Sequence, residues 1–338
     1  MYYVGCDQHK KYSYVVVKDQ KGNTLNQVKL YHADKENMKN YFKGLPNAST
    51  VAIESCTFAH WLGDMLEELG LKVKMSHPTK TKAIAEEKIK TDKISASVLA
   101  DLLRADMLPQ AYRAPVDTRD SRSLMRYRQH LVTLRTSLKN RIHCIIDYHG
   151  IQQSFSDLFG VDGRRFIEQL KLRPTYKSII ENCLAIIDDL NKRISKLDYQ
   201  LKCKIKTNNK AKALATIPGI GAIIANIILA EAGDINRFAN HHRFARYIGI
   251  VPSIHQSGQI LYHGHITKQG NKYLRTAFVE AAQTAIRRDP YLLAQFNKIK
   301  TKKGYGVAIV AIAHKLTKSA YMILKNNWEY RYRSVYNR

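Results

Sequence analysis

The N-terminal stretch MYYVGCD, residues 1–7, decides the fold, because its apolar residues predict a short β-strand that ends at Asp7. The segment SYVVVK at 13–18 predicts a second strand. Lys21-Gly22-Asn23 then predicts a turn into a third strand at 24–30. Three strands joined by short connections indicate a β-meander at the start of the chain.

Strands and helices alternate beyond this meander. TVAIES at 50–55 predicts a fourth strand, which carries Glu54, and LKVKM at 71–75 predicts a fifth. The helices expected in this region cover residues 35–44, 58–69 and 91–106. The last of them, TDKISASVLADLLRAD, has apolar residues every three to four positions and opens near Asp92. A meander followed by alternating strands and helices is typical of the α/β class.

The charge of the chain points to a polyanionic partner. Its 338 residues include 55 Lys and Arg against 28 Asp and Glu, which gives a formal net charge of +27. An excess this large favours nucleic acid over an acidic membrane surface, although some soluble proteins are simply basic. The length allows two or three domains, and a hydrophobic fraction of 45% is typical of a folded protein rather than a disordered one.

The cysteines and the N-terminus bear on the compartment. The five cysteines are scattered and lack C-x-x-C pairing, so they indicate reduced thiols rather than disulfides or a zinc site. The first residues lack the basic and apolar regions of a signal peptide, and no apolar run of about 18 residues predicts a membrane span. We therefore expect a cytoplasmic protein without membrane attachment.

Two long amphipathic helices are expected in the middle of the chain, at 117–149 and about 175–206. They predict either a coiled-coil arm suited to dimerisation or helices that pack on the α/β domain. We place the domain boundaries at 1–116 for the α/β domain, 117–208 for the helical arm and 209–338 for a mainly helical C-terminal domain.

Three carboxylates of the first domain are candidate metal ligands. Asp7 and Glu54 end predicted strands, and Asp92 opens a predicted helix. If the two strands are neighbours, both strand-end carboxylates emerge at one edge of the sheet. Carboxylate oxygens suit Mg²⁺, and such ions can stabilise the attacking and leaving oxygens of a phosphoryl transfer. Taken singly, Asp7 is also an ordinary turn residue and Asp92 an ordinary helix cap.

The C-terminal domain carries a candidate phosphate-binding turn. Within ATIPGIGAIIANIILAEAGD at 215–234, the glycines Gly219 and Gly221 precede an apolar helix in the manner of a helix-hairpin-helix motif. Glycines let the backbone approach a phosphate, and the helix N-terminus supplies N–H donors and a positive dipole. A tight turn without any ligand is the alternative.

A glycine-rich segment follows at 245–275 and predicts short strands before a helix from about Asn271. Ser257 lies in its middle beside Gly258, and the cations Lys268 and Arg275 are near enough in sequence to contact a phosphate. Serine before glycine usually marks only a turn, and its hydroxyl needs a base or a metal to become a nucleophile. Beyond residue 287, basic and aromatic residues alternate, which suits phosphate contacts and base stacking but also fits a basic surface with core tyrosines.

Together these motifs resemble a known family. Asp7, Glu54, the helix KTDKI-x-A-x-x-LADLLR, IPGIG and the segment around Ser257 with G-x-I-x-K-x-G-x-x-x-LR are similar to the DEDD-motif transposases of insertion sequences. That family includes pilin-gene invertases and bridge-RNA-guided recombinases, and the likeness spans nearly the whole chain. It implies an RNase H-like (RuvC-like) domain, a coiled-coil segment and a transposase domain with a nucleophilic serine.

The resemblance also assigns roles. Asp7, Glu54 and Asp92 match the first three acidic residues, and Ser257 matches the serine that attacks DNA. In relatives, the acidic site of one protomer meets the serine of another in a tetramer, and a structured non-coding RNA pairs with DNA. The implied partners are therefore Mg²⁺, DNA, a guide RNA and further copies of the chain, as a dimer or tetramer.

One position departs from the family pattern. The fourth acidic position, three residues after Asp92, is Ser95 here. A hydroxyl is a weaker Mg²⁺ ligand than a carboxylate, so we expect lower metal affinity. The sequence thus leaves three functions open: a serine-using transposase or recombinase, a RuvC-like nuclease that cuts by hydrolysis, and a nucleic-acid-binding protein weakened in catalysis by Ser95.

Overall fold

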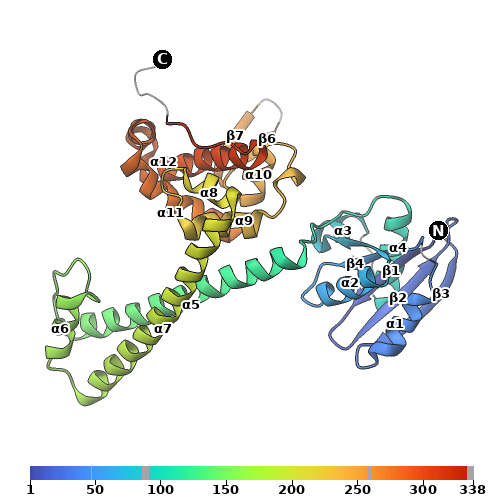
Figure 1. The fold of residues 1–338 in the computed structure, drawn as a ribbon, viewed down its shortest axis with the longest axis horizontal. Helices are drawn as coiled ribbons and strands as arrows, with labels where there is room; N and C mark the ends of the chain where they lie inside the picture. Colours follow the sequence, from blue (N-terminus) through green and yellow to red (C-terminus); the bar gives the residue numbers. More distant parts are fainter. Residues whose placement is uncertain (47, 86–90, 258–259, 333–338) are drawn as a thin grey trace. The chain divides into compact units, whose positions relative to one another are not determined.

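The computed structural model describes residues 1–46, 48–85, 91–257 and 260–332, which form two compact units, 1–113 and 114–338 (Figure 1). The first contains, in chain order, β1 Tyr3–Gln8, β2 Tyr12–Lys18, β3 Thr24–Tyr31, α1 Lys35–Lys43, β4 Thr50–Glu54, α2 Ala59–Glu68, β5 Lys72–Ser76, α3 Pro78–Ile84 and α4 Asp92–Arg104.

The five strands form one mixed sheet in the order β3-β2-β1-β4-β5. β1, β2 and β3 pair antiparallel as a meander, whereas β4 pairs parallel with β1, and β5 parallel with β4. The α/β prediction is therefore confirmed, and the arrangement belongs to the RNase H-like class. The parallel pairing of β1 with β4 places the ends of both strands at the same edge of the sheet.

Side chains alternate between the two faces of the sheet, as strand geometry requires. Val4 and Cys6 of β1 pack with α1 and α2 in the larger core cluster of this unit. Ala52 of β4 packs instead with Leu99 of α4 on the opposite face. Gly5, the register partner of Ala52, faces α4 as well, because a Cβ built on it would lie 1.9 Å from the Ala96 carbonyl oxygen.

The second unit is almost entirely helical. Its elements are α5 Val116–Tyr148, α6 Val161–Gln169, α7 Pro174–Thr207, α8 Asn209–Ala215, α9 Ala222–Ala232, the short 3₁₀ helix η1 Ile235–Arg237, α10 His241–Ile248, β6 Pro252–Ser257, β7 Ile260–Ile266, α11 Lys272–Arg288 and α12 Pro290–Asn326. The predicted long helices correspond to α5 and α7, which lie side by side over part of their length (Figure 1). The helices α3, α6 and α10 were not predicted, and the last residues of α10 occupy the start of the segment that was expected to form short strands.

α5 and α7 are joined by apolar contacts and by ion pairs. Leu131 of α5 packs against Leu190 and Ile194 of α7. Arg128 of α5 donates two hydrogen bonds to the Asp198 carboxylate of α7, at 2.5 and 3.2 Å. This antiparallel pair is an internal helical hairpin.

α12 contains an apolar window long enough to cross a membrane, by length and composition alone. In this unit 56% of that window is buried, and residues such as Ile312, Leu316 and Ala320 belong to the main core cluster. The backbone also departs from helical geometry at Gly304. α12 therefore has the features of a core helix, and its hydropathy is weak evidence for a membrane span.

Candidate functional site

Close packing of α4 on β1 brings two of the predicted ligands together. A Cβ on Gly5 would meet the Ala96 carbonyl oxygen at 1.9 Å and the Ala100 backbone nitrogen at 2.6 Å, so only glycine admits the helix this closely. Asp7 lies two residues beyond Gly5 on the same face of β1. Asp92 lies one helical turn before Ala96 on α4, so both carboxylates reach the same edge of the sheet.

His9 lies between these two carboxylates and was missed from the sequence. Its Nε2 is 3.5 Å from Oδ2 of Asp7 and 3.2 Å from Oδ1 of Asp92. One ligand atom from each of the three residues lies within 4.8 Å of the others, as a metal site requires. The signal that could have found it is the spacing Asp7-x-His9, which keeps both side chains on one side of an extended chain.

Tyr12, the first residue of β2, contacts the carboxylate oxygen of Asp92 that is not the one nearest His9. Its hydroxyl donates a hydrogen bond of 2.8 Å to Oδ2 of Asp92. This bond stabilises the neutral phenol, so it raises the pKa of Tyr12. The ring also stacks near the His9 ring at 4.8 Å and lies 3.7 Å from the Lys29 ammonium. A tight turn places His9 and Tyr12 together, because the His9 amide donates to the Tyr12 carbonyl oxygen.

Glu54 lies close to this cluster but outside it. β1 and β4 are in register with Cys6 beside Ile53, so Asp7 and Glu54 follow at the same level of neighbouring strands. Glu54 also shares a face of β4 with Ala52, which packs toward α4. Among the described residues, however, the group with ligand atoms within 4.8 Å comprises only Asp7, His9 and Asp92.

Ser95 lies on α4, one turn from Asp92, and is partly buried. Asp101, further along the same helix, forms an ion pair with the Lys18 ammonium of β2. The ion pair gives Asp101 a structural role, because the Lys18 ammonium belongs to a side chain that is only 8% exposed and needs a partner of opposite charge. Asp101 therefore neutralises a buried cation away from the Asp7 edge of the sheet.

Ser257 ends β6 in the second unit. β6 and β7 form an antiparallel hairpin in which Ser257 pairs with Ile260. The side chain of Ser257 and residues 258–259 lie outside the described part of the chain. The backbone thus places the predicted nucleophile at the end of a two-stranded hairpin.

The base of this hairpin is fixed by backbone hydrogen bonds and by Arg275. The Lys268 amide donates to Gly249, and Lys268 itself has a positive φ of 52°. One nitrogen of Arg275 donates to the carbonyl oxygens of Ile248 and Lys268, at 2.9 and 3.1 Å. Arg275 therefore has a structural role at the hairpin base, while contacts of Lys268 and Arg275 with nucleic acid stay predictions.

Gly219 and Gly221 lie in the turn between α8 and α9. Gly219 has φ +84°, and a Cβ there would lie 2.1 Å from the Ala281 carbonyl oxygen of α11. Helix packing is thus sufficient reason for glycine at 219. Gly221 precedes the first residue of α9 and has no atom within 4 Å of a built Cβ. Of the two, Gly221 leaves more room for a phosphate.

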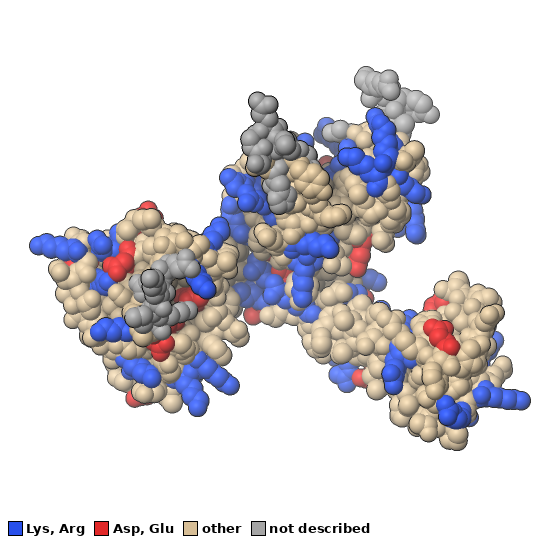
Figure 2. Space-filling model, turned by 180° about the vertical axis from the view of Figure 1, so that it is seen from behind, with Lys and Arg blue, Asp and Glu red and all other residues tan. Residues whose placement is uncertain are grey.

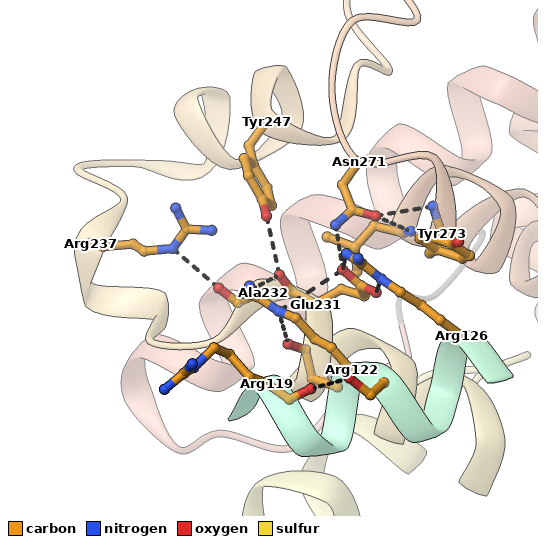
Figure 3. Close-up of polar contacts among 12 residues, drawn as sticks. Arg119, Arg122, Arg126, Glu231, Ala232, Arg237, Tyr247, Asn271 and Tyr273 are labelled. Carbon is orange, nitrogen blue, oxygen red and sulfur yellow. Dashed lines mark hydrogen bonds and ion pairs between the residues drawn. The ribbon is translucent and has the colours of Figure 1, made fainter. Parts of the chain in front are cut away.

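A buried carboxylate links the long helix α5 to the residues at the base of the β6–β7 hairpin (Figure 3). Glu231 of α9 has 1% of its side chain exposed and accepts two hydrogen bonds from Arg126 of α5, at 2.7 and 2.9 Å. The carboxylate raises the pKa of Arg126. The Asn271 side-chain amide donates to the same carboxylate at 2.6 Å, and its carbonyl oxygen accepts from Tyr273 and Leu274 at the start of α11.

Lysine and arginine side chains dominate the charged groups on the face drawn in Figure 2. A groove beside α12 combines such cations with aromatic rings; its lining includes Lys315, Lys318, Trp328, Arg331 and Tyr332. Trp328 and Tyr332 have 55% and 62% of their surface exposed. By contrast, Phe296 and Tyr321 are buried in the core, so the sequence pattern of basic and aromatic residues mixes core and surface positions.

The mixed sheet belongs to an RNase H-like domain, and the matches to family models show that the protein is an enzyme that cuts and rejoins DNA, of a type that uses divalent metal. A family model described as "Transposase", of the DEDD type, matches residues 4–150. A second, described as "Transposase IS116/IS110/IS902 family", matches residues 211–297. The chain belongs to this family of DEDD-motif insertion-sequence transposases.

Several named proteins are similar to the chain. A probable family 20 transposase of Pseudomonas aeruginosa is 27% identical over 257 residues, 74% of this chain and 75% of its own. The transposase for insertion sequence element IS1328 of Yersinia enterocolitica is 24% identical over 324 residues, 95% of this chain and 96% of its own. The pilin gene-inverting protein of Moraxella bovis is 34% identical over 144 residues, 40% of this chain and 44% of its own.

Proposed function

We propose that the protein moves an insertion-sequence element by a serine-dependent recombination reaction assisted by Mg²⁺ and directed by a guide RNA. One observation carries most of the weight: the approach of Asp92 to Asp7 at the sheet edge, in a chain with both family matches. The relatives named as transposases and as a pilin gene-inverting protein support the reaction class.

The residues at the sheet edge fit a divalent cation. Asp7 and Asp92 supply carboxylate oxygens, Glu54 ends the neighbouring strand, and Ser95 supplies a hydroxyl one turn along α4. Mg²⁺ prefers oxygen ligands and keeps several waters, which a partly exposed edge provides. When bound, the ion would stabilise the negative charge that develops on the oxygens of the scissile phosphate.

The reaction step assigned to Ser257 is a phosphoryl transfer. The Oγ atom forms a bond to phosphorus as the bond between phosphorus and one deoxyribose oxygen breaks, and the hydroxyl proton passes to solvent or a nearby base. The released deoxyribose oxygen takes up a proton. The product is a phosphoserine link, which a second DNA hydroxyl reverses in the rejoining step. The position of Ser257 at the end of the β6–β7 hairpin suits a residue that has to approach a phosphate of the DNA backbone.

Trapping the covalent intermediate tests this assignment. Ser257→Ala should abolish protein–DNA adducts and strand exchange while DNA binding stays within a few-fold of the unaltered protein. Ser253→Ala, on the same strand, is the matched control and should retain both. Recombination by Ser257→Ala at the normal rate would refute the serine assignment.

A RuvC-like hydrolytic nuclease is the second candidate, because the acidic cluster lies entirely within one unit and is compatible with attack by water. Under this alternative, Asp7→Ala loses metal-dependent cleavage, Ser257→Ala does not, and cut DNA carries free ends without attached protein. The same adduct assay therefore separates the two candidates.

Nucleic-acid binding and self-association complete the proposal. The groove beside α12 combines lysine ammonium groups with exposed Trp328 and Tyr332, a mixture suited to single-stranded nucleic acid. The helical hairpin of α5 and α7 offers a surface for a dimer or tetramer. Sequencing of nucleic acid that copurifies with the protein tests the guide RNA, and light scattering tests the oligomer.

A further inference from the structure

The geometry points to His9 as a direct ligand of the metal ion, so that this site prefers Mn²⁺ to Mg²⁺. The inference rests on the proposed metal site and adds to it a nitrogen ligand that the acidic motif does not contain. It starts from the position of one atom, Nε2 of His9, between the carboxylates of Asp7 and Asp92.

The distances suit ligands of one ion. Neighbouring ligands around an ion with bonds of about 2.1 Å are separated by about 3 Å. Nε2 of His9 lies 3.2 Å from Oδ1 of Asp92 and 3.5 Å from Oδ2 of Asp7. All three atoms lie within 4.8 Å of one another, and two ligands on opposite sides of such an ion are about 4.2 Å apart. A small shortening of the distances between these three atoms is therefore enough for all of them to bind one ion.

The Nε2 atom of His9 accepts or donates no hydrogen bond among the described residues, although the atom itself is buried. Its only printed contacts are those with the carboxylates of Asp7 and Asp92, at 3.5 and 3.2 Å. A buried polar atom without a partner is costly, and coordination would satisfy it. Asp92, in contrast, has its second oxygen fixed by the Tyr12 hydroxyl at 2.8 Å, which leaves the oxygen nearer His9 for the ion.

The ligand type decides the preference among metals. Imidazole nitrogen binds first-row transition metals well, whereas Mg²⁺ is held by oxygen ligands. Two carboxylates and one imidazole therefore favour Mn²⁺ over Mg²⁺ more than an all-oxygen set does. His9 also restores a ligand to a site in which Ser95 replaces a carboxylate.

The test is Mn²⁺ binding to the full chain, followed by electron paramagnetic resonance. Pulsed spectra of the bound ion should show coupling to ¹⁴N of the imidazole. His9→Gln and His9→Ala should both lose this coupling, and Mn²⁺ affinity should fall by about 10- to 100-fold. In competition experiments, Mg²⁺ affinity should change much less, so the preference for Mn²⁺ should disappear.

His32→Gln is the matched control, because His32 lies in the same unit and bonds to Ser13 and to the Lys10 carbonyl oxygen instead of the carboxylates. That variant should keep the ¹⁴N coupling. Bound Mn²⁺ without ¹⁴N coupling in the unaltered protein, or coupling that survives in both His9 variants, would overturn the role of His9 and leave the acidic site intact. If Asp7→Asn also binds Mn²⁺ normally, the proposed metal site itself is wrong.

Discussion

Replacing Gly5 by alanine should separate the carboxylates of Asp7 and Asp92 without changing either residue. The substituted Cβ would lie 1.9 Å from the Ala96 carbonyl oxygen, whereas ordinary contact begins at 3.4 Å, so α4 has to retreat by about 1.5 Å. The neighbours are backbone atoms of a helix, which cannot rotate away as a side chain does. Overpacking of this kind costs about 1–3 kcal/mol.

The retreat of α4 should also move Asp92 away from the other residues of the proposed metal site. Asp92 belongs to the first turn of the same helix, and its Oδ1 is 3.2 Å from Nε2 of His9. A shift of about 1.5 Å opens that distance beyond what one ion can bridge, so we expect divalent-metal affinity to fall at least about 10-fold. Denaturant unfolding measures the first effect, and Mn²⁺ titration of the folded protein measures the second.

Gly44→Ala is the matched control within the same unit. Gly44 ends α1 with φ −72°, and the nearest atom to its built Cβ lies at 3.4 Å. That change should alter the free energy of unfolding by less than about 0.5 kcal/mol. If Gly5→Ala unfolds at the same denaturant concentration as the unaltered protein and binds Mn²⁺ equally well, the reasoning from close packing is wrong.

Four further outcomes are expected. Glu231→Gln should lower the free energy of unfolding by about 2–4 kcal/mol in denaturant titrations, since it leaves the partly exposed Arg126 without its charged partner; unfolding at the normal midpoint would contradict this. Tyr12→Phe should weaken Mn²⁺ binding, measured by titration, because Asp92 loses the hydroxyl that orients it; an unchanged affinity would exclude that role. Ser95→Asp should raise the number of Mn²⁺ ions bound per chain, measured by equilibrium dialysis. DNA affinity should fall steeply with salt in fluorescence titrations, as phosphate neutralisation requires, and a flat response would argue against the basic surface.

The order and type of the main elements could be predicted from the sequence because their patterns are local. The short apolar runs of the early strands and the period of three to four in the long helices are visible in any short window. The missed helices α3, α6 and α10 have only 7, 9 and 8 residues, too few for a clear helical period. The division of the second unit into a separate arm and a C-terminal domain stays a prediction.

The candidate site could be predicted only in part. Strand and helix ends identified Asp7 and Asp92, because an acidic residue at an element boundary is visible in sequence. His9 was missed because it follows the end of β1 and meets Asp92 only after α4 has packed on the sheet. The Glu231–Arg126 pair was missed for a similar reason, since 105 residues separate its members.

In the proposed metal site, Ser95 lowers the negative charge relative to a fourth carboxylate, and His9 supplies a neutral ligand. Four carboxylates would carry a charge of −4 and neutralise two divalent ions, whereas Asp7, Glu54 and Asp92 carry −3. A first ion still meets an excess of negative charge, but a second would leave the site positive, so its binding should weaken far more than that of the first. An imidazole adds a ligand without adding negative charge, which strengthens the first ion and does nothing for the second. If the proposed site is right, a chain with serine at 95 and histidine at 9 should hold one ion firmly, and a second ion should bind only with the phosphates of bound DNA, whose negative charge would replace the missing carboxylate.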